Sequence, residues 1–142
     1  MKLYRATNNY TGPGSCWAKR QEDALAYRDN PGYGGENIIT TEVNPLRCKI
    51  LWVDKYNSQE FAHLLISTCG TESALPFLSS EGYDDDNGKF VVEFYTMNNN
   101  QYQFSENWLD DEDIRDILAK KYDWAVYTDT YPRDCETWVK LK

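Results

Sequence analysis

The sequence predicts an α+β protein that folds as a single domain over residues 1–142. Its length is typical of one domain, and a content of 41% hydrophobic and 15% aromatic residues is enough for a buried core. The predicted elements follow the order β, α, β, β, α, β, α, β, β, without the alternating βαβ units of a parallel sheet. This order disfavours a doubly wound nucleotide-binding fold.

The first predicted elements are a strand over residues 2–6 and a helix over residues 20–28. The helical segment is rich in residues that favour helices, and Glu22 and Asp23 suit its positive first turn. We expect this helix to end before Pro31, which cannot continue it.

Two consecutive strands are predicted next, over residues 37–43 and 47–53. Both are β-branched and aromatic runs, and Asn44-Pro45 between them is typical of a turn. A second helix is predicted over residues 58–67, where apolar residues recur at helical spacing, and a further strand over residues 89–96.

The last predicted elements are a helix over residues 110–122 and two strands over residues 123–128 and 136–141. Acidic residues fill the first turn of this helix, and Lys120 and Lys121 lie in its last turn, which matches the helix dipole. The two strands form a terminal hairpin around a turn.

Charge and composition limit the classes of function. The net charge of −8 disfavours sequence-independent binding to nucleic-acid phosphates. No apolar run approaches the roughly 18 residues needed to span a bilayer, and the first ten residues lack the apolar core of a signal peptide. We therefore expect a cytoplasmic protein with no membrane association. The charge is uneven, because residues 1–28 carry five basic and two acidic residues, a net +3, which leaves −11 for the rest.

Several kinds of site are disfavoured by the residues present. Four scattered cysteines and one histidine, His63, do not match a zinc site, so we expect free thiols and no metal. The two standard glycine motifs that bind phosphates, G-x-G-x-x-G and G-x-x-x-x-G-K-[ST], do not occur in the sequence. The acidic runs at residues 84–86 and 110–113 lack the spacing of a calcium loop, and solvated charge explains them better.

Two charged residues near the chain ends are candidates for a site. Arg5 lies in the segment LYRAT, where strand alternation puts it on the face of Leu3, and an arginine on an apolar face needs an anionic partner. Glu136 opens the last predicted strand. Either Arg5 forms a structural salt bridge with an acid such as Glu136, or both residues line one cleft.

Three short motifs, in this order, resemble those of the ADP-ribosyltransferase superfamily, its diphtheria-toxin-like and poly(ADP-ribose)-polymerase-like members included. They are LYRAT at residues 3–7, GSCWAKRQEDALAYRDN with NIITTEVNP at residues 14–30 and 37–45, and CETWVKL at residues 135–141. The resemblance implies a compact split β-sheet, or barrel-like, fold with a few peripheral helices. It also implies NAD as a co-substrate.

The resemblance assigns a cofactor-binding role to five residues of the first two motifs. Arg5, with its neighbour Ala6, corresponds to the first-motif position that fixes the ribose or phosphate of NAD. Trp17 takes the aromatic position of the second motif, and Tyr27 corresponds to the tyrosine that stacks on nicotinamide. Lys19 adds positive charge to the same site.

Glu136 corresponds to the catalytic glutamate of the family. Such a carboxylate would stabilise the positive charge that develops on the ribose as its bond to nicotinamide breaks. Asp129 and Asp134 lie in the same terminal hairpin and stay open as alternatives for the catalytic acid. Asp134, two positions before Glu136, also matches a position that bears on the choice of acceptor.

The resemblance implies a small mono-ADP-ribosyltransferase that transfers ADP-ribose from NAD to a macromolecular target. It would suit a phage or mobile-element factor that modifies a host protein, for example a defence component such as a CRISPR effector. The chain has Ala6, Cys16 and Ala24 where many members have Gly, Tyr and Ser. Two alternatives therefore stay open: a catalytically degenerate acidic protein that blocks a nucleic-acid-binding partner, and an NAD glycohydrolase that uses water as the acceptor.

Overall fold

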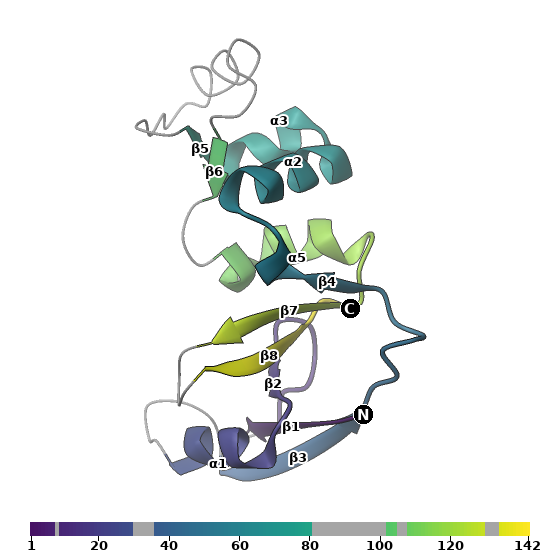
Figure 1. The fold of residues 1–142 in the computed structure, drawn as a ribbon, viewed down its shortest axis with the longest axis vertical. Coiled ribbons are helices and arrows are strands. Elements are labelled where there is room, and N and C mark those ends of the chain that lie inside the picture. The colour runs from purple at the N-terminus through teal and green to yellow at the C-terminus, as the bar shows by residue number, and fades with distance from the viewer. Residues whose placement is uncertain (8, 30–35, 81–101, 105–107, 130–133) are drawn as a thin grey trace. The chain divides into compact units, whose positions relative to one another are not determined.

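The structure is a computed structural model that describes residues 1–7, 9–29, 36–80, 102–104, 108–129 and 134–142 (Figure 1). Contacts between residues divide the chain into two compact units. The first comprises Met1–Asp54 with Tyr122–Lys142, and the second comprises Lys55–Lys121. No linker in the sequence marks this division.

The first unit contains a six-stranded mixed sheet, with the order β3-β1-β2-β8-β7-β4. The bounds of its strands are Lys2–Thr7 (β1), Cys16–Ala18 (β2), Asn37–Glu42 (β3), Ile50–Trp52 (β4), Trp124–Asp129 (β7) and Cys135–Lys140 (β8). Neighbouring strands are antiparallel except for β4 and β7, which are parallel. The mixed α and β content predicted from the sequence is confirmed.

The ladder between β1 and β2 is much shorter than the others. β1 pairs with β3 along its whole length, from Lys2↔Glu42 to Thr7↔Asn37, whereas β1 and β2 share the single pair Tyr4↔Ala18. The sequence does not predict β2, because three residues are too few for a periodic pattern. The sheet therefore contains an internal junction at which two strands are held by one residue pair.

Alternation of side chains divides the sheet into two faces. One face carries the core cluster, in which Trp17 and Val126 both lie opposite Trp138 in the register. The rings of Trp124 and Trp138 pack edge to face, with their centroids 6.0 Å apart, and Trp138 is 1% exposed. Helix α1 (Gln21–Asp29) packs against β1, β2 and β3, and its bounds agree with the predicted helix to within one residue.

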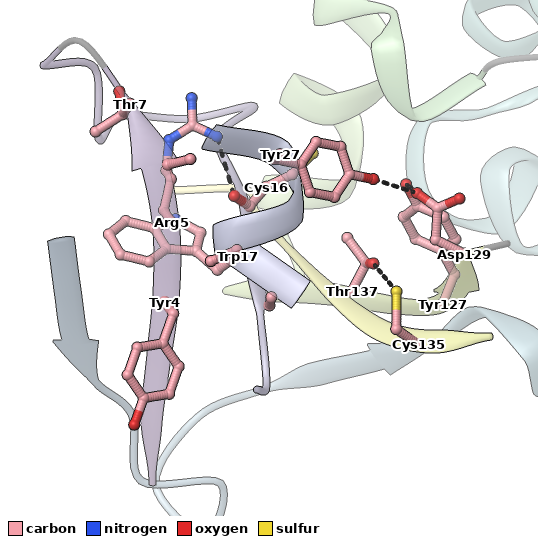
Figure 2. A pocket seen from close by; sticks show the side chains of 13 residues that line it. Tyr4, Arg5, Thr7, Cys16, Trp17, Tyr27, Tyr127, Asp129, Cys135 and Thr137 are labelled. Atoms are coloured by element: carbon pink, nitrogen blue, oxygen red, sulfur yellow. Dashed lines mark hydrogen bonds between the residues drawn. The ribbon is translucent and has the colours of Figure 1, made fainter. Parts of the chain in front are cut away.

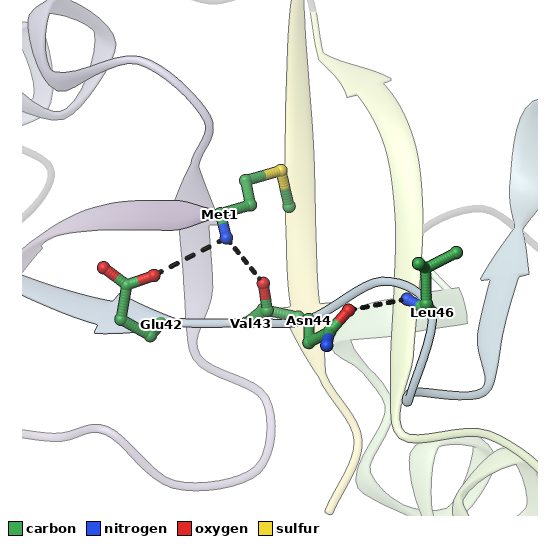
Figure 3. Close-up of polar contacts among 5 residues, drawn as sticks. All are labelled: Met1, Glu42, Val43, Asn44 and Leu46. Carbon is green, nitrogen blue, oxygen red and sulfur yellow. Dashed lines mark hydrogen bonds and ion pairs between the residues drawn. The ribbon is translucent and has the colours of Figure 1, made fainter.

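A tight turn connects β3 to the segment before β4 (Figure 3). The side-chain oxygen of Asn44 accepts a hydrogen bond from the Leu46 amide at 3.1 Å, and the Leu46 side chain is 95% exposed. Beside it, the amino group of Met1 donates to the Val43 carbonyl at 2.8 Å and lies 3.5 Å from the Glu42 carboxylate. These contacts extend the β1–β3 pairing by one residue.

Asp123 joins the starts of β4 and β7. Its carboxylate accepts a hydrogen bond from the Lys49 amide at 2.8 Å, and its own amide donates to the Lys49 carbonyl at 2.8 Å. Lys142 forms an ion pair with the same carboxylate at 3.2 Å. The hydrogen bond from Lys49, assisted by the charge of Lys142 and opposed by partial burial, lowers the pKa of Asp123 from its ordinary value.

The second unit contains helices and a short hairpin. Its α-helices are α2 (Ser58–Cys69), α3 (Thr71–Ala74) and α5 (Glu112–Ala119), and the hairpin consists of β5 (Leu78–Ser80) and β6 (Tyr102–Phe104). Short 3-10 turns cover Leu75–Phe77 and Trp108–Asp110, and another, Val53–Lys55, begins in the first unit and ends at the first residue of the second. Helix α2 packs against α3, α5 and β6. None of the helices in the described part of the chain is long and apolar enough to cross a bilayer.

The two long helices of this unit begin at side-chain caps. Asn57 accepts a hydrogen bond from the Glu60 amide at 2.8 Å, and Asp111 accepts from the Asp113 and Ile114 amides. Both helices occupy regions where the sequence predicts helices, although α5 is shorter than the predicted range at each end. The strand predicted over residues 89–96 lies outside the described residues.

Replacing Asp123 with Asn is expected to lower the free energy of unfolding by about 1 kcal/mol near neutral pH, because the charged acceptor is lost. Folding lowers the pKa of this carboxyl, so its contribution is present above the unfolded pKa of about 3.9 and is lost as the pH falls through the folded value. Urea unfolding of both proteins at neutral and acidic pH measures this. Asp116→Asn, at an exposed position of α5, is the control. A difference in stability that does not shrink in acid would contradict the assignment.

Candidate functional site

A cavity of about 450 Å³ opens in the first unit where β1 and β2 separate (Figure 2). Its size is within the usual range of small-ligand pockets. Its wall is formed by β1, β2, α1, β7 and β8. The lining residues are Tyr4, Arg5, Ala6, Thr7, Cys16, Trp17, Ala18, Ala24, Tyr27, Tyr127, Asp129, Cys135 and Thr137.

Arg5 spans the opening between β1 and β2. Its Nη1 donates to the Cys16 carbonyl at 2.9 Å and its Nε donates to the Tyr10 carbonyl at 3.0 Å. A side chain thus replaces the backbone pairing that stops after Tyr4↔Ala18. Partial burial lowers the pKa of Arg5 from its ordinary value, but a guanidinium stays protonated in proteins. The cavity therefore has a positive charge on the wall formed by β1.

Asp129 lies on another part of the wall, within reach of two tyrosine hydroxyl groups. Tyr27 on α1 and Tyr127 on β7 both donate to Asp129 Oδ2, at 3.3 and 3.4 Å. Tyr127 and Asp129 are two residues apart in a strand and therefore project from the same face. Burial, followed by the nearby Asp129 carboxylate, raises the pKa of Tyr27, so its hydroxyl is a donor at neutral pH.

Arg5, Tyr27 and Asp129 thus line the same cavity. In Figure 2 the Tyr27 ring lies between the Arg5 guanidinium and the Asp129 carboxylate. The wall therefore combines a cation, an aromatic surface and an anion. Such a wall suits a ligand that has an anionic part, a flat ring and a region that is or becomes positively charged.

Glu136 does not line the cavity, in contrast to the prediction that it shares a cleft with Arg5. Its neighbours in β8, Cys135 and Thr137, are on the cavity wall, and successive side chains of a strand point to opposite faces. Glu136 Oε1 accepts a hydrogen bond from Trp138 Nε1 at 2.8 Å, which places its carboxylate on the face of the core cluster. The acid on the cavity wall is Asp129, one of the predicted alternatives.

The salt bridge between Arg5 and Glu136 is not formed either. Both hydrogen bonds of the Arg5 guanidinium go to main-chain carbonyls, and Glu136 pairs with Lys19, whose Nζ lies 3.7 Å from Oε2. The physical reason is the junction between β1 and β2, which offers Arg5 carbonyl oxygens at its own end of the sheet. Lys19 and Asp134 are exposed and are not among the lining residues.

Trp17, which takes the aromatic position of the second motif, has little surface available to a ligand. It borders the cavity, but it is only 3% exposed and belongs to the core cluster. Its Nε1 donates to Ser15 Oγ at 2.9 Å, which fixes the indole within the first unit. The half-buried Tyr27 is the aromatic residue better placed to meet a ligand, and Ala6 also lines the wall.

The sequence predictions missed Tyr127, Thr137 and Cys135 as wall residues. A signal for Tyr127 was present, because it lies near the end of the strand predicted over residues 123–128 and two positions before Asp129. If the strand extends by one residue, as β7 does, the two side chains share a face. The wall positions of Cys135 and Thr137 follow from the same rule applied to β8. That rule needs the register between β7 and β8, which pairs Asp129 with Cys135 and Tyr127 with Thr137.

Comparisons with protein-family models, with curated proteins and with solved structures found no match for this chain. In the described residues, no group of three or more His, Cys, Asp or Glu side chains is arranged to hold a metal ion.

Asp129→Asn is expected to lower the pKa of Tyr27, because removing the carboxylate charge makes the phenolate less unfavourable. Burial still acts on Tyr27 in this variant, so its pKa stays above the ordinary value. Alkaline titration of tyrosinate absorbance measures the change, and Tyr27→Phe identifies which transition belongs to Tyr27. The assignment fails if the titration curves of Asp129→Asn and the unmodified protein coincide.

Proposed function

We propose that this chain is a mono-ADP-ribosyltransferase with the split-sheet fold of that superfamily, and that Asp129 takes the role first assigned to Glu136. The observation that carries the proposal is that Arg5, Tyr27 and Asp129 line the same cavity. NAD has the matching polarity, since its pyrophosphate is anionic and its nicotinamide ring is cationic. The separation of β1 and β2 supports the split-sheet fold.

Arg5 is the proposed anchor for the anionic part of NAD. Two of its nitrogens are occupied by the Cys16 and Tyr10 carbonyls, and Nη2 has no hydrogen-bond acceptor among the described residues. The side chain is half-buried, so its charge is less screened than that of an exposed lysine. A guanidinium held in this way offers its remaining N–H groups to a phosphate or a ribose oxygen.

Tyr27 and Asp129 are the proposed partners of nicotinamide and its ribose. The Tyr27 ring supplies flat aromatic surface, while its hydroxyl orients the Asp129 carboxylate. As the C1′–N bond breaks, nicotinamide leaves with the bonding electron pair and positive charge grows on the ribose. A carboxylate already fixed beside that ribose stabilises this charge without reorganisation. The acceptor nucleophile then bonds to C1′ and releases its proton to water.

The acceptor in this proposal is a side chain of a macromolecular target, such as a host protein. The sequence resemblance favours a macromolecular acceptor, whereas the cavity itself is equally compatible with water as the acceptor. The NAD glycohydrolase therefore enters the test as a distinct outcome.

The proposal is tested by incubating the protein with NAD and a host lysate while measuring nicotinamide release and transfer of labelled ADP-ribose. Asp129→Asn is expected to reduce both by about 100-fold or more, the usual cost of losing a group that stabilises transition-state charge. Glu136→Gln, the matched control from the opposite face of the sheet, should retain activity within a few-fold.

The possible results separate the hypotheses. Nicotinamide release without transfer would identify a glycohydrolase. No consumption of NAD by the unmodified protein would reject the enzyme and leave the acidic binding protein. Activity lost in Glu136→Gln but retained in Asp129→Asn would reject the assignment of Asp129.

Arg5→Lys is expected to weaken NAD binding by about 10-fold, because lysine keeps the charge but cannot bind two carbonyls and a phosphate at once. Arg5→Ala should weaken it further. Binding to the unmodified protein should decline with added salt, and this dependence should be smaller in Arg5→Ala. Titration calorimetry measures all three proteins. Equal affinity of the three would contradict the role of Arg5.

A further inference from the structure

Asp54 makes an unusual pair of contacts with the end of β7. Its Oδ2 accepts a hydrogen bond from the Thr128 amide at 3.0 Å and another from the Thr128 hydroxyl at 2.7 Å. Both residues are exposed, and both belong to the first unit. An interaction in which one carboxylate accepts two hydrogen bonds from the same residue is stronger than a typical surface contact.

The register of the sheet explains why the contact forms there. β4 runs parallel to β7 with the pairs Ile50↔Trp124 and Trp52↔Val126, so two further residues would bring position 54 beside Thr128. The ladder stops at Trp52 because the chain enters a 3-10 turn. The Asp54 carboxylate supplies the acceptor that the departing strand no longer provides, and the amide of Thr128 stays satisfied.

Thr128 is flanked by the two β7 residues of the cavity wall. Tyr127 and Asp129 project to the cavity face. Hydrogen bonds that fix the main chain at Thr128 therefore restrain both side chains. β7 ends at Asp129, so the carboxylate of the wall sits on the last residue of its strand. The end of a strand frays most easily unless it is tied down.

We propose that Asp54 is a positioning residue, which holds the end of β7 so that the Asp129 carboxylate stays against the hydroxyls of Tyr27 and Tyr127. Asp54 acts through Thr128 and is not itself on the cavity wall. The expected effect of Asp54 on NAD turnover rests on the proposed function. Its expected effect on the contacts of Asp129 with Tyr27 and Tyr127 does not. The two are therefore tested separately.

The first test uses no ligand. NMR of protein with ring-labelled tyrosine reports the surroundings of Tyr27 and Tyr127, and Asp129→Asn defines the shifts that follow when the carboxylate is lost. Asp54→Ala is expected to move both resonances toward those of Asp129→Asn. The control is Asp116→Ala, which removes an exposed aspartate of α5 and should move neither. Unchanged Tyr27 and Tyr127 resonances in a folded Asp54→Ala protein would overturn the proposal.

The second test measures NAD turnover. A displaced carboxylate weakens transition-state stabilisation more than NAD binding, so Asp54→Ala should lower kcat by about 10- to 100-fold with little change in KM. Asp54→Asn, which keeps an acceptor oxygen for Thr128, should recover most of the loss. A purely structural role would move neither kcat nor the tyrosine resonances once the protein is folded, and that result would overturn the proposal. If the resonances shift but no variant or unmodified protein consumes NAD, positioning stands and the proposed function fails.

Discussion

The sheet depends on the junction between β1 and β2, where one residue pair, Tyr4↔Ala18, joins two strands. Arg5 stabilises this junction by donating to the Cys16 carbonyl on β2 and to the Tyr10 carbonyl in the intervening loop. The Arg5 side chain lies where ladder hydrogen bonds would otherwise continue, and both strands contribute residues to the cavity wall. The residue that bridges β1 and β2 therefore also places a positive charge on the cavity wall.

The two-residue period of β7 and β8 then decides which side chains reach that cavity. In β8, Cys135 and Thr137 face it, while Glu136 lies with Trp138 on the face of the core cluster. In β7, Asp129 faces it together with Tyr127. A shift of one residue in either strand would exchange these sets, so register carries as much chemical meaning here as residue type.

The sequence was sufficient for elements whose signals are local. The helices α1, α2 and α5 were predicted from helix-favouring residues, apolar spacing and the charges of their end turns, and β3 and β4 from β-branched and aromatic runs. β1, β7 and β8 also lie where strands were predicted. β2 was missed because its three residues become a strand only through their partners in β1 and β8. The cavity wall shows the same limit: the motifs include Arg5 and Tyr27, which line it, but motif order could not tell Glu136 from Asp129, since only the register separates their faces.

The same distinction between local and long-range effects applies to charge. The first 28 residues hold five basic side chains, yet Arg5 is the one of these that lines the cavity, while Lys19, Arg20 and Arg28 are exposed. Charges in solvent are screened beyond roughly 8–10 Å at physiological salt, so the net charge of −8 acts weakly on a small ligand already inside the cavity. A half-buried guanidinium at contact distance acts on such a ligand more strongly than the net charge does. The acidic excess would act mainly on a partner with an extended surface, such as the proposed macromolecular target, which would meet many of these carboxylates at once.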